Sequence, residues 1–225
     1  MGIGGYYLIG LLAFAGSLLV QMWLRNTYGT WMNRPNTAGL SGSDTARAIL
    51  DANGLHDVKV EMVNGKLTDH YDPTSKTVRL SESNYRQRSV AGMAVAAHEV
   101  GHAIQHAKAY APLRMRATLL PAAQIGSRWG PMLALFGLFF GGGPNILLQL
   151  GIWLFAGAVL FQLITLPVEF DASRRALVQM KQLQLVTPQD SNGARAVLTA
   201  AAMTYVAAAA TAITYLVYFF LASRE

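Results

Sequence analysis

The chain has 225 residues, 52% of them hydrophobic and 13% charged, whereas about a quarter of the residues in a soluble domain carry charge. This composition argues against a freely soluble protein. Because the sequence contains no cysteine, disulfides, iron–sulfur clusters, thiolate zinc sites and a cysteine nucleophile are excluded. Any metal must therefore be bound by His, Asp or Glu.

Residues 1–24 contain no charged side chain and are long enough to cross about 30 Å of hydrocarbon as a helix. A signal peptide would begin with basic residues before a shorter apolar core, and residues 1–5 contain no basic residue. We therefore predict a retained transmembrane anchor over residues 1–24.

Residues 25–116 are predicted to form a small water-facing α+β segment, zincin-like and cytoplasmic, which begins with a polar linker over residues 33–42. Capping and turn signals predict its elements. These are a helix from Ser43 or Asp44 to Ala52 ended by Gly54, a hairpin of strands 58–62 and 66–70 around Asn64-Gly65, a strand 76–80, and a helix from Ser83 or Asn84 past His106. About 75 residues are too few for a large core, so we expect this segment to pack on the membrane helices.

A second apolar region over residues 117–168 is interrupted by three glycines and Pro144, which do not continue a helix. The pattern predicts a hairpin of two spans, then a cytoplasmic helix within residues 169–195 and a last span within residues 196–225. The first arm contains Arg128, which costs about 2.5–3.5 kcal/mol at mid-membrane unless it faces a polar interior, so a re-entrant arm is an alternative. The predicted fold is mainly α, a polytopic membrane protein with about four transmembrane helices.

The basic residues predict the orientation of the chain. Of the 18 Lys and Arg, twelve lie within residues 25–116 and four within residues 174–195. By the positive-inside rule both regions are cytoplasmic, and the two termini and the glycine turn lie outside. The net charge of +6 is therefore interpreted as an orientation signal, and we expect no nucleic-acid partner.

The candidate catalytic and metal-binding residues are concentrated in His98-Glu99-Val100-Gly101-His102, on the last predicted helix of the water-facing segment. Residues four apart share one helix face, so the two imidazoles can bind one zinc ion, and Glu99 can act as general base. An apolar stripe is predicted on the opposite face of the helix; it comprises Met93, Ala97, Val100 and Ile104. The alternative is a pair of surface histidines beside a glutamate.

A catalytic zinc needs a third protein ligand, and Glu169, at the end of the predicted hairpin, is our candidate. Two full crossings return the chain to the side of His98 and His102. The alternative for Glu169 is a charge at a helix start, which is favourable to the helix dipole. Asp171 could orient a ligand histidine or cap a helix over residues 172–185.

Three more residues are candidates for a role at the site. His70 and Tyr71 could stabilise the oxyanion of a tetrahedral intermediate, or could belong only to the turn before Pro73. His106 lies eight residues after His98, about 12 Å along the helix axis, which is too far to share the metal. It is therefore a surface histidine or a substrate-side group.

The chain resembles the bacterial membrane peptidases of the neutral zinc metallopeptidase (YugP-like) family. The resemblance rests on the N-terminal span and on the strings DHYDP (69–73), TVRLS (77–81), AAHEVGHAIQ (96–105) and LPVEFDAS (166–173). It implies a zinc peptidase of the bacterial inner membrane.

The layout is also similar to that of membrane-embedded gluzincins such as the heat-shock protease HtpX and the CAAX prenyl protease. These carry a two-span hairpin between the histidine motif and a Glu-x-x-Ala-Asp motif. Glu169 and Ala172 match that motif, but Ser173 stands in place of its aspartate, and Asp171 is a candidate substitute. The site-2 intramembrane proteases fit worse.

The sequence thus predicts a zinc endopeptidase with its active site on the cytoplasmic face of the membrane. Its expected substrates are membrane proteins or membrane-proximal peptides, which strand 76–80 could bind as an added strand. One alternative is a non-catalytic membrane adaptor or scaffold stabilised by zinc, and another is a transporter. A regulatory membrane partner or a homo-oligomer is compatible with the sequence.

Overall fold

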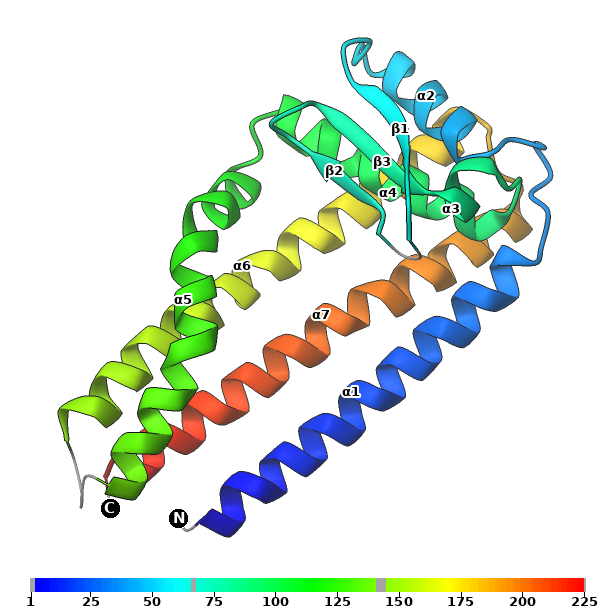
Figure 1. The fold of residues 1–225 in the computed structure, drawn as a ribbon. Helices are drawn as coiled ribbons and strands as arrows, with labels where there is room; N and C mark the ends of the chain where they lie inside the picture. Colours follow the sequence, from blue (N-terminus) through cyan, green and yellow to red (C-terminus); the bar gives the residue numbers. More distant parts are fainter. Residues whose placement is uncertain (1–2, 66–67, 141–144, 225) are drawn as a thin grey trace. The chain divides into compact units, whose positions relative to one another are not determined.

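The computed structural model describes residues 3–65, 68–140 and 145–224, and Figure 1 labels its helices and strands. They are α1 (Ile3–Met32), α2 (Gly42–Ala52), β1 (Lys59–Val63), β2 (His70–Asp72), β3 (Thr77–Ser81), α3 (Glu82–Arg86), α4 (Val90–Ala107), α5 (Ala111–Phe140), α6 (Ile146–Gln182) and α7 (Pro188–Ala222). The prediction of a mainly α fold with a small sheet is confirmed. The predicted glycine turn at residues 141–144 lies outside the described residues.

The chain divides into two compact units. Unit 1 contains Met1–Gln21, Ala111–Pro167 and Met203–Glu225, and unit 2 contains Met22–Tyr110 and Val168–Ala202. The described part of unit 1 consists of segments of α1, α5, α6 and α7, and its charged side chains are Arg114, Arg116, Arg128 and Arg224. Unit 2 holds the sheet, α2, α3, α4 and the remaining turns of α1, α6 and α7.

Three helices among the described residues are long and apolar enough to cross a membrane, namely Gly4–Met32, Ile146–Gln182 and Pro188–Ala222. The predicted anchor is part of a longer helix, because α1 continues past Leu24 to Met32. α5, which contains Arg114, Arg116 and Arg128, is outside this set. By length and composition, three of the four predicted spans are therefore present.

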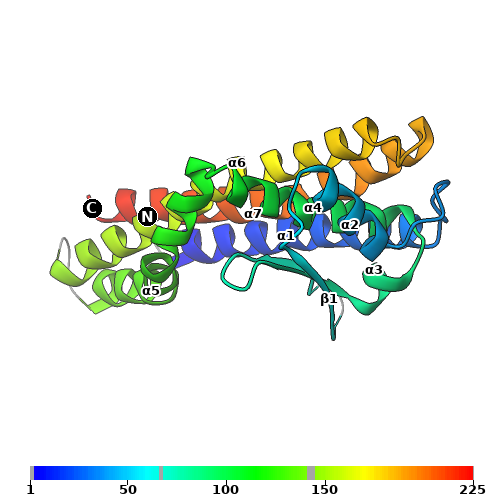
Figure 2. The same ribbon diagram turned by 90° about the horizontal axis from the view of Figure 1, so that it is seen from above.

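Within unit 1, α5 and α6 pack closely along each other in opposite directions, as expected for the predicted hairpin (Figure 2). A side chain at Gly126 would meet the backbone of Leu154, and one at Gly137 would meet the backbone of Leu148. Small residues at such positions let two helix backbones approach each other within a membrane. The glycines of α5 therefore set the separation of the two helices.

The sheet differs from the prediction. Its strand order is β1-β3-β2; β1 pairs with β3 in parallel and β2 pairs with β3 in antiparallel fashion. The expected hairpin around Asn64-Gly65 is wrong, because β1 takes the later strand as its partner and the sheet strand after the turn begins only at His70. β3 is consequently the central strand, so the prediction that strand 76–80 offers a free edge is also wrong.

The helices of unit 2 begin at caps that the sequence partly indicated. α2 is capped by Ser41 instead of Ser43 or Asp44, and Asp44 completes the capping box from the third helical position. The helix predicted from Ser83 past His106 is two helices, α3 and α4, separated at residues 87–89. The linker stabilises this break with two backbone hydrogen bonds: Val90 N donates to Arg34 O, and Asn36 N donates to Arg88 O.

α6 is one continuous helix of 37 residues, from Ile146 to Gln182. The third predicted span and the predicted cytoplasmic helix are therefore a single element. Glu169 and Asp171 lie in its interior, so the alternatives that made them a helix-start charge and a helix cap are wrong.

The contact between α5 and α6 can be tested with two glycines. Gly137→Ala places a methyl group against the backbone of Leu148 and must push the helices apart, at a cost of about 1–3 kcal/mol. Gly157→Ala is the matched control, because a methyl group added there has no atom within 4 Å and alanine is the better helix former. Thermal unfolding in detergent is expected to show a lower midpoint for the first variant only. Equal midpoints would contradict this account of the packing.

Candidate metal centre and active site

The site is built on α4, which crosses the core of unit 2. Ser89 caps the helix by accepting a hydrogen bond from Gly92 N at 3.0 Å. Met93, Ala97, Val100 and Ile104 are all buried in the core, which confirms the predicted apolar stripe. The side chains of His98 and His102 are 15% and 12% exposed, so they line a partly open face of the helix.

α6 passes over α4 at Gly101, between Glu99 and His102. A methyl group at Gly101 would lie 2.6 Å from the carbonyl oxygen of Ala172, which is closer than a carbon atom can approach. The sequence therefore needs glycine here. Because Ala172 stands between Glu169 and Ser173 on α6, this crossing brings both of those side chains to the histidine face of α4.

The three predicted metal ligands meet at this crossing. Nε2 of His98 lies 3.3 Å from Oε2 of Glu169, and Nε2 of His102 lies 3.6 Å from the same oxygen. The two rings meet edge to face with centroids 4.8 Å apart. One donor atom from each residue lies within 4.8 Å of the others, which is the arrangement that one small cation requires.

Each imidazole is oriented by a second hydrogen bond on its other nitrogen. Nδ1 of His98 lies 3.1 Å from the hydroxyl of Ser173, and Nδ1 of His102 lies 3.0 Å from Oε1 of Gln105. A metal-binding histidine characteristically makes such a bond, which turns its free nitrogen to the metal. Ser173 thus acts on His98 from the position that holds aspartate in the Glu-x-x-Ala-Asp motif.

Asp171 touches neither histidine directly. Its carboxylate accepts hydrogen bonds from Gln105 Nε2 at 3.0 Å and from Arg174 at 2.6 Å, and it also pairs with Arg175. The prediction that Asp171 takes the place of the motif's aspartate, in direct contact with a histidine, is therefore wrong. Asp171 instead reaches His102 through Gln105.

Glu99 differs from Glu169 in its surroundings. It is 8% exposed, and no other described side chain forms a hydrogen bond with its carboxylate. Burial raises the pKa of Glu99, against the opposing charges of His98 and His102, and the neighbouring Glu169 raises it further. A carboxylate with a raised pKa and no fixed partner is suited to accept and release a proton.

The acidic groups also act on the histidines. Burial disfavours the charged form of His102, but its hydrogen bond with Glu169 and the charge of Glu99 outweigh burial and raise its pKa. Two carboxylates therefore make this site attractive to a cation. Two imidazoles and one carboxylate are a donor set that zinc accepts in catalytic sites, so the residues fit a zinc ion.

The three remaining candidates, His70, Tyr71 and His106, lie outside the group of His98, His102 and Glu169. Nδ1 of His70 faces the carbonyl of Thr68 at 2.8 Å, and the side chain is exposed. Tyr71 on β2 is bonded to Nδ1 of His106 at 2.9 Å. Burial, with the charges of Asp57 and Asp72, raises the pKa of Tyr71 to about 12, so its hydroxyl remains a donor. None of these three residues belongs to the group of side chains that could hold a metal ion.

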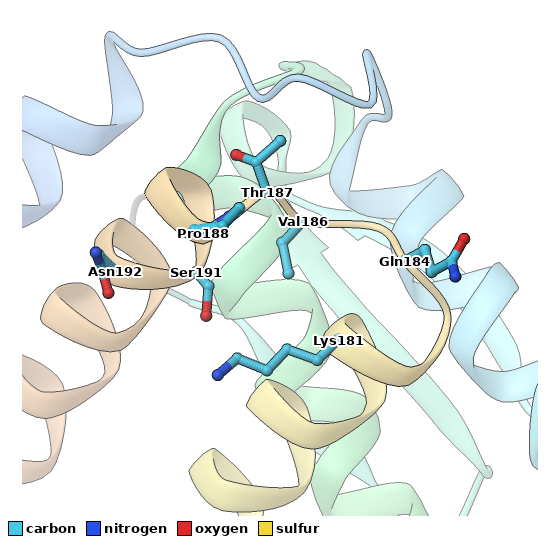
Figure 3. Close-up of a pocket in the computed structure, with 7 residues that line it drawn as sticks. All are labelled: Lys181, Gln184, Val186, Thr187, Pro188, Ser191 and Asn192. Carbon is cyan, nitrogen blue, oxygen red and sulfur yellow. The ribbon is translucent and has the colours of Figure 1, made fainter.

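Two cavities of unit 2 help to delimit the site. One of about 220 Å³ is bordered by Tyr71 and His106, one helical turn beyond His102. Another, of about 350 Å³, lies at the turn between α6 and α7 and is lined by Lys181, Gln184, Val186, Thr187, Pro188, Ser191 and Asn192 (Figure 3). It begins about 18 Å along α6 from Glu169 and contains no histidine or carboxylate.

Comparison with known proteins agrees with this geometry. A family described as "Putative neutral zinc metallopeptidase" matches residues 6–224. The chain belongs to this neutral zinc metallopeptidase family. It is 44% identical over 214 residues to the "Putative membrane protease YugP" of Bacillus subtilis (strain 168), covering 95% of this chain and 94% of that protein. No solved structure matches the chain.

Membership of the neutral zinc metallopeptidase family makes zinc the cofactor, in agreement with the prediction from the histidine motif. The described part of the chain offers one group of three metal-binding side chains, which is His98, His102 and Glu169. The resemblance predicted from the sequence is thereby confirmed at the level of the family.

Two residues at the site were not predicted as partners of the ligands. Gln105 follows His102 by three positions, so the helix places the two side chains next to each other, and this spacing is the signal that could have revealed it. Ser173 follows Glu169 by four positions and was noted only as a departure from a related motif.

The crossing at Gly101 makes a direct prediction for metal binding. Gly101→Ala must separate α4 from α6 and move Glu169 away from the histidines, so zinc affinity measured by chelator competition is expected to fall at least about tenfold. Gly29→Ala, in α1 of the same unit, has no atom within 4 Å of the added methyl group and is expected to bind zinc normally. Unchanged affinity in Gly101→Ala would contradict the role of the close crossing.

Proposed function

We propose that this chain is a membrane-embedded, zinc-dependent endopeptidase that hydrolyses peptide bonds in membrane or membrane-proximal proteins. The observation that carries the proposal is the group of His98, His102 and Glu169 with Glu99 beside it. Three protein ligands leave a tetrahedral zinc one open position, which is typical of catalytic sites, whereas structural sites are closed by four.

The residues of the chain have separate tasks in this reaction. His98, His102 and Glu169 hold the zinc, which when bound activates water near neutral pH and polarises the scissile carbonyl. Glu99 accepts a proton from the attacking water and delivers it to the departing amine. Ser173 and Gln105 keep the imidazoles in the orientation that the ligands need.

The substrate is expected to bind along β2. With β3 in the centre of the sheet, β2 is the edge strand that contacts α4 through Tyr71 and His106. An extended peptide can add to such an edge through its main-chain hydrogen bonds. The cavity bordered by Tyr71 and His106 would then lie next to the bound peptide, which agrees with a substrate-side role for His106.

The membrane arrangement that we propose has four spans, with α5 as the fourth. The described residues of unit 1 are nearly all helical, and the charged side chains among them are four arginines, of which Arg128 also lies over the ring of Trp129 at 5.9 Å. Glu169 follows the last residue of unit 1 in α6, Pro167, by two positions. With sixteen of the 18 basic residues in two regions, the positive-inside rule puts the site on the cytoplasmic face of the bacterial inner membrane.

A zinc-stabilised adaptor without catalysis is the competing function. Such a site would need a fourth protein ligand, but the group among the described residues has three members, and the next histidine on α4, His106, is hydrogen-bonded to Tyr71 instead. A glutamate without a fixed partner also serves no purpose in a purely structural site. Both observations favour the peptidase.

Two variants separate catalysis from metal binding. Glu99→Gln is expected to keep zinc at the wild-type stoichiometry and lose at least about a thousandfold in proteolysis, because the general base is gone. Glu169→Ala is expected to lose both zinc and activity, because it removes a ligand. Metal analysis and cleavage of an unfolded membrane-protein substrate, each on purified protein in detergent, measure the two effects.

Glu82→Gln is the matched control for these variants, because Glu82 is exposed on α3 with only a loose ion pair to Arg86 at 3.7 Å. It should keep both zinc and activity. Full proteolysis by Glu99→Gln would overturn the mechanism, and full zinc content in Glu169→Ala would overturn the ligand assignment.

The proposed orientation can be tested because the chain contains no cysteine of its own. Phe140→Cys lies at the exposed end of α5, and Thr74→Cys lies on the exposed turn before β3. In intact cells with a permeabilised outer barrier, a membrane-impermeant maleimide is expected to label only Phe140→Cys. After lysis both variants should react. Labelling of Thr74→Cys in intact cells would contradict the proposed orientation and indicate the opposite one.

A further inference from the structure

Gln105 is a fully buried polar side chain that does not belong to the group of His98, His102 and Glu169 and lines neither of the two cavities described above. It stands on α4 one turn beyond His102 and forms hydrogen bonds to three partners. Its Oε1 lies 3.0 Å from Nδ1 of His102, and its Nε2 donates to the carbonyl of Val168 at 2.8 Å and to Asp171 at 3.0 Å. Burying an amide in an apolar core is favourable only when all its polar atoms are bonded.

These partners fix which way the amide group points. The carbonyl of Val168 and the carboxylate of Asp171 can only accept hydrogen bonds, so the NH2 group of Gln105 must face them. Its oxygen must then face His102. An amide oxygen only accepts, and therefore Nδ1 of His102 carries a proton; in the neutral imidazole, the form that binds a metal, Nε2 is then the nitrogen with the lone pair.

The negative charge of Asp171 strengthens the hydrogen bonds between Gln105 and its partners. Asp171 is held as a carboxylate between Arg174 and Arg175, and the guanidinium of Arg175 also lies 5.7 Å from the ring centre of Tyr110. A chain of hydrogen bonds runs from the arginines through Asp171 and Gln105 to His102. Such chains polarise their members, and hydrogen bonding to the outer nitrogen makes an imidazole a better ligand.

The same amide also ties the two helices together. Val168 immediately precedes Glu169, so the hydrogen bond from Gln105 to its carbonyl holds the turn of α6 that carries the third ligand. We propose that Gln105 is a positioning residue, which with Asp171 fixes His102 in the Nδ1-protonated form and fixes Glu169 in register with it. This inference rests on the proposed zinc site and adds a role for two residues that bind no metal.

The experiment measures metal binding and does not depend on proteolysis. Gln105→Leu keeps the approximate size of the side chain and removes all three hydrogen bonds. Its zinc affinity, measured on the full-length protein in detergent by competition with a chelator, is expected to fall about 10- to 100-fold. The visible absorption spectrum of the cobalt-substituted protein is expected to change, because His102 and Glu169 no longer hold one geometry.

Thr45→Val is the matched control for a lost buried hydrogen bond. Thr45 is fully buried on α2, and its hydroxyl donates to Ser41 O at 2.8 Å. This variant is expected to lose some thermal stability and to keep the zinc affinity and the cobalt spectrum of the wild type. Wild-type affinity and spectrum in Gln105→Leu, or an equal loss of affinity in Thr45→Val, would overturn the proposal.

Asp171→Asn provides a second test if Gln105→Leu does not fold. It keeps an acceptor for Gln105 and removes the negative charge, so zinc affinity is expected to fall about threefold, less than on complete loss of such a partner. No change in affinity would overturn the part assigned to Asp171. Wild-type protein that binds zinc but cleaves no substrate would instead overturn the proposed function and leave the assignment of Gln105 intact.

Discussion

The close crossing of α4 and α6 at Gly101 and Ala172 is the constraint on which the site depends. Helix axes usually lie 8–10 Å apart, depending on the side chains at the contact, and a residue with no side chain permits the closest approach. Short side chains require this approach, because a glutamate and a serine must reach across from α6 to two histidines on α4. The glycine inside the histidine motif is thus as necessary to the geometry as the histidines.

Both sides of the crossing follow the same design. Each histidine directs Nε2 at Glu169 and Nδ1 at a neutral partner, Ser173 or Gln105. The negative charge of Asp171 reaches His102 only through Gln105, and Asp171 is paired with Arg174 and Arg175. The acids nearest the histidines are therefore Glu169, which contacts both imidazoles, and Glu99, which has no fixed side-chain partner among the described residues.

Local patterns in the sequence were enough to predict the histidine face of α4, since helical periodicity alone separates it from Met93 and Val100. Glu169 could be predicted from topology, because two expected crossings would return the chain to the side of the histidines, and Glu169 does lie beside them. The sheet could not be predicted in this way. Asn64-Gly65 is a strong local turn signal, but β1 pairs in parallel with β3, which is not the next strand along the chain, and no short-range pattern reports such a pairing.

The helix boundaries show the same limit. The break between α3 and α4 depends on backbone hydrogen bonds from residues 34–36, which are distant in sequence, so that Ser89 could not be recognised as a cap beforehand. The continuity of α6 through Pro167 was equally hidden, because proline is a common end signal for helices. The spacing of Gln105 from His102 is visible in the sequence, but its hydrogen bonds to Val168 and Asp171 on α6 cannot be predicted from α4 alone.

The ligand set also has a consequence for the topology of the chain. Between His102 and Glu169 the polypeptide runs through α5, residues 141–144 and most of α6 before it returns. In the proposed site, a zinc ion bound at both ends would close this segment into a loop. In a protein without cysteine, the metal would then take the place of a disulfide cross-link, and a link that closes a long loop is stabilising. Loss of zinc would therefore release His102 from Glu169 as well as stop the proposed hydrolysis.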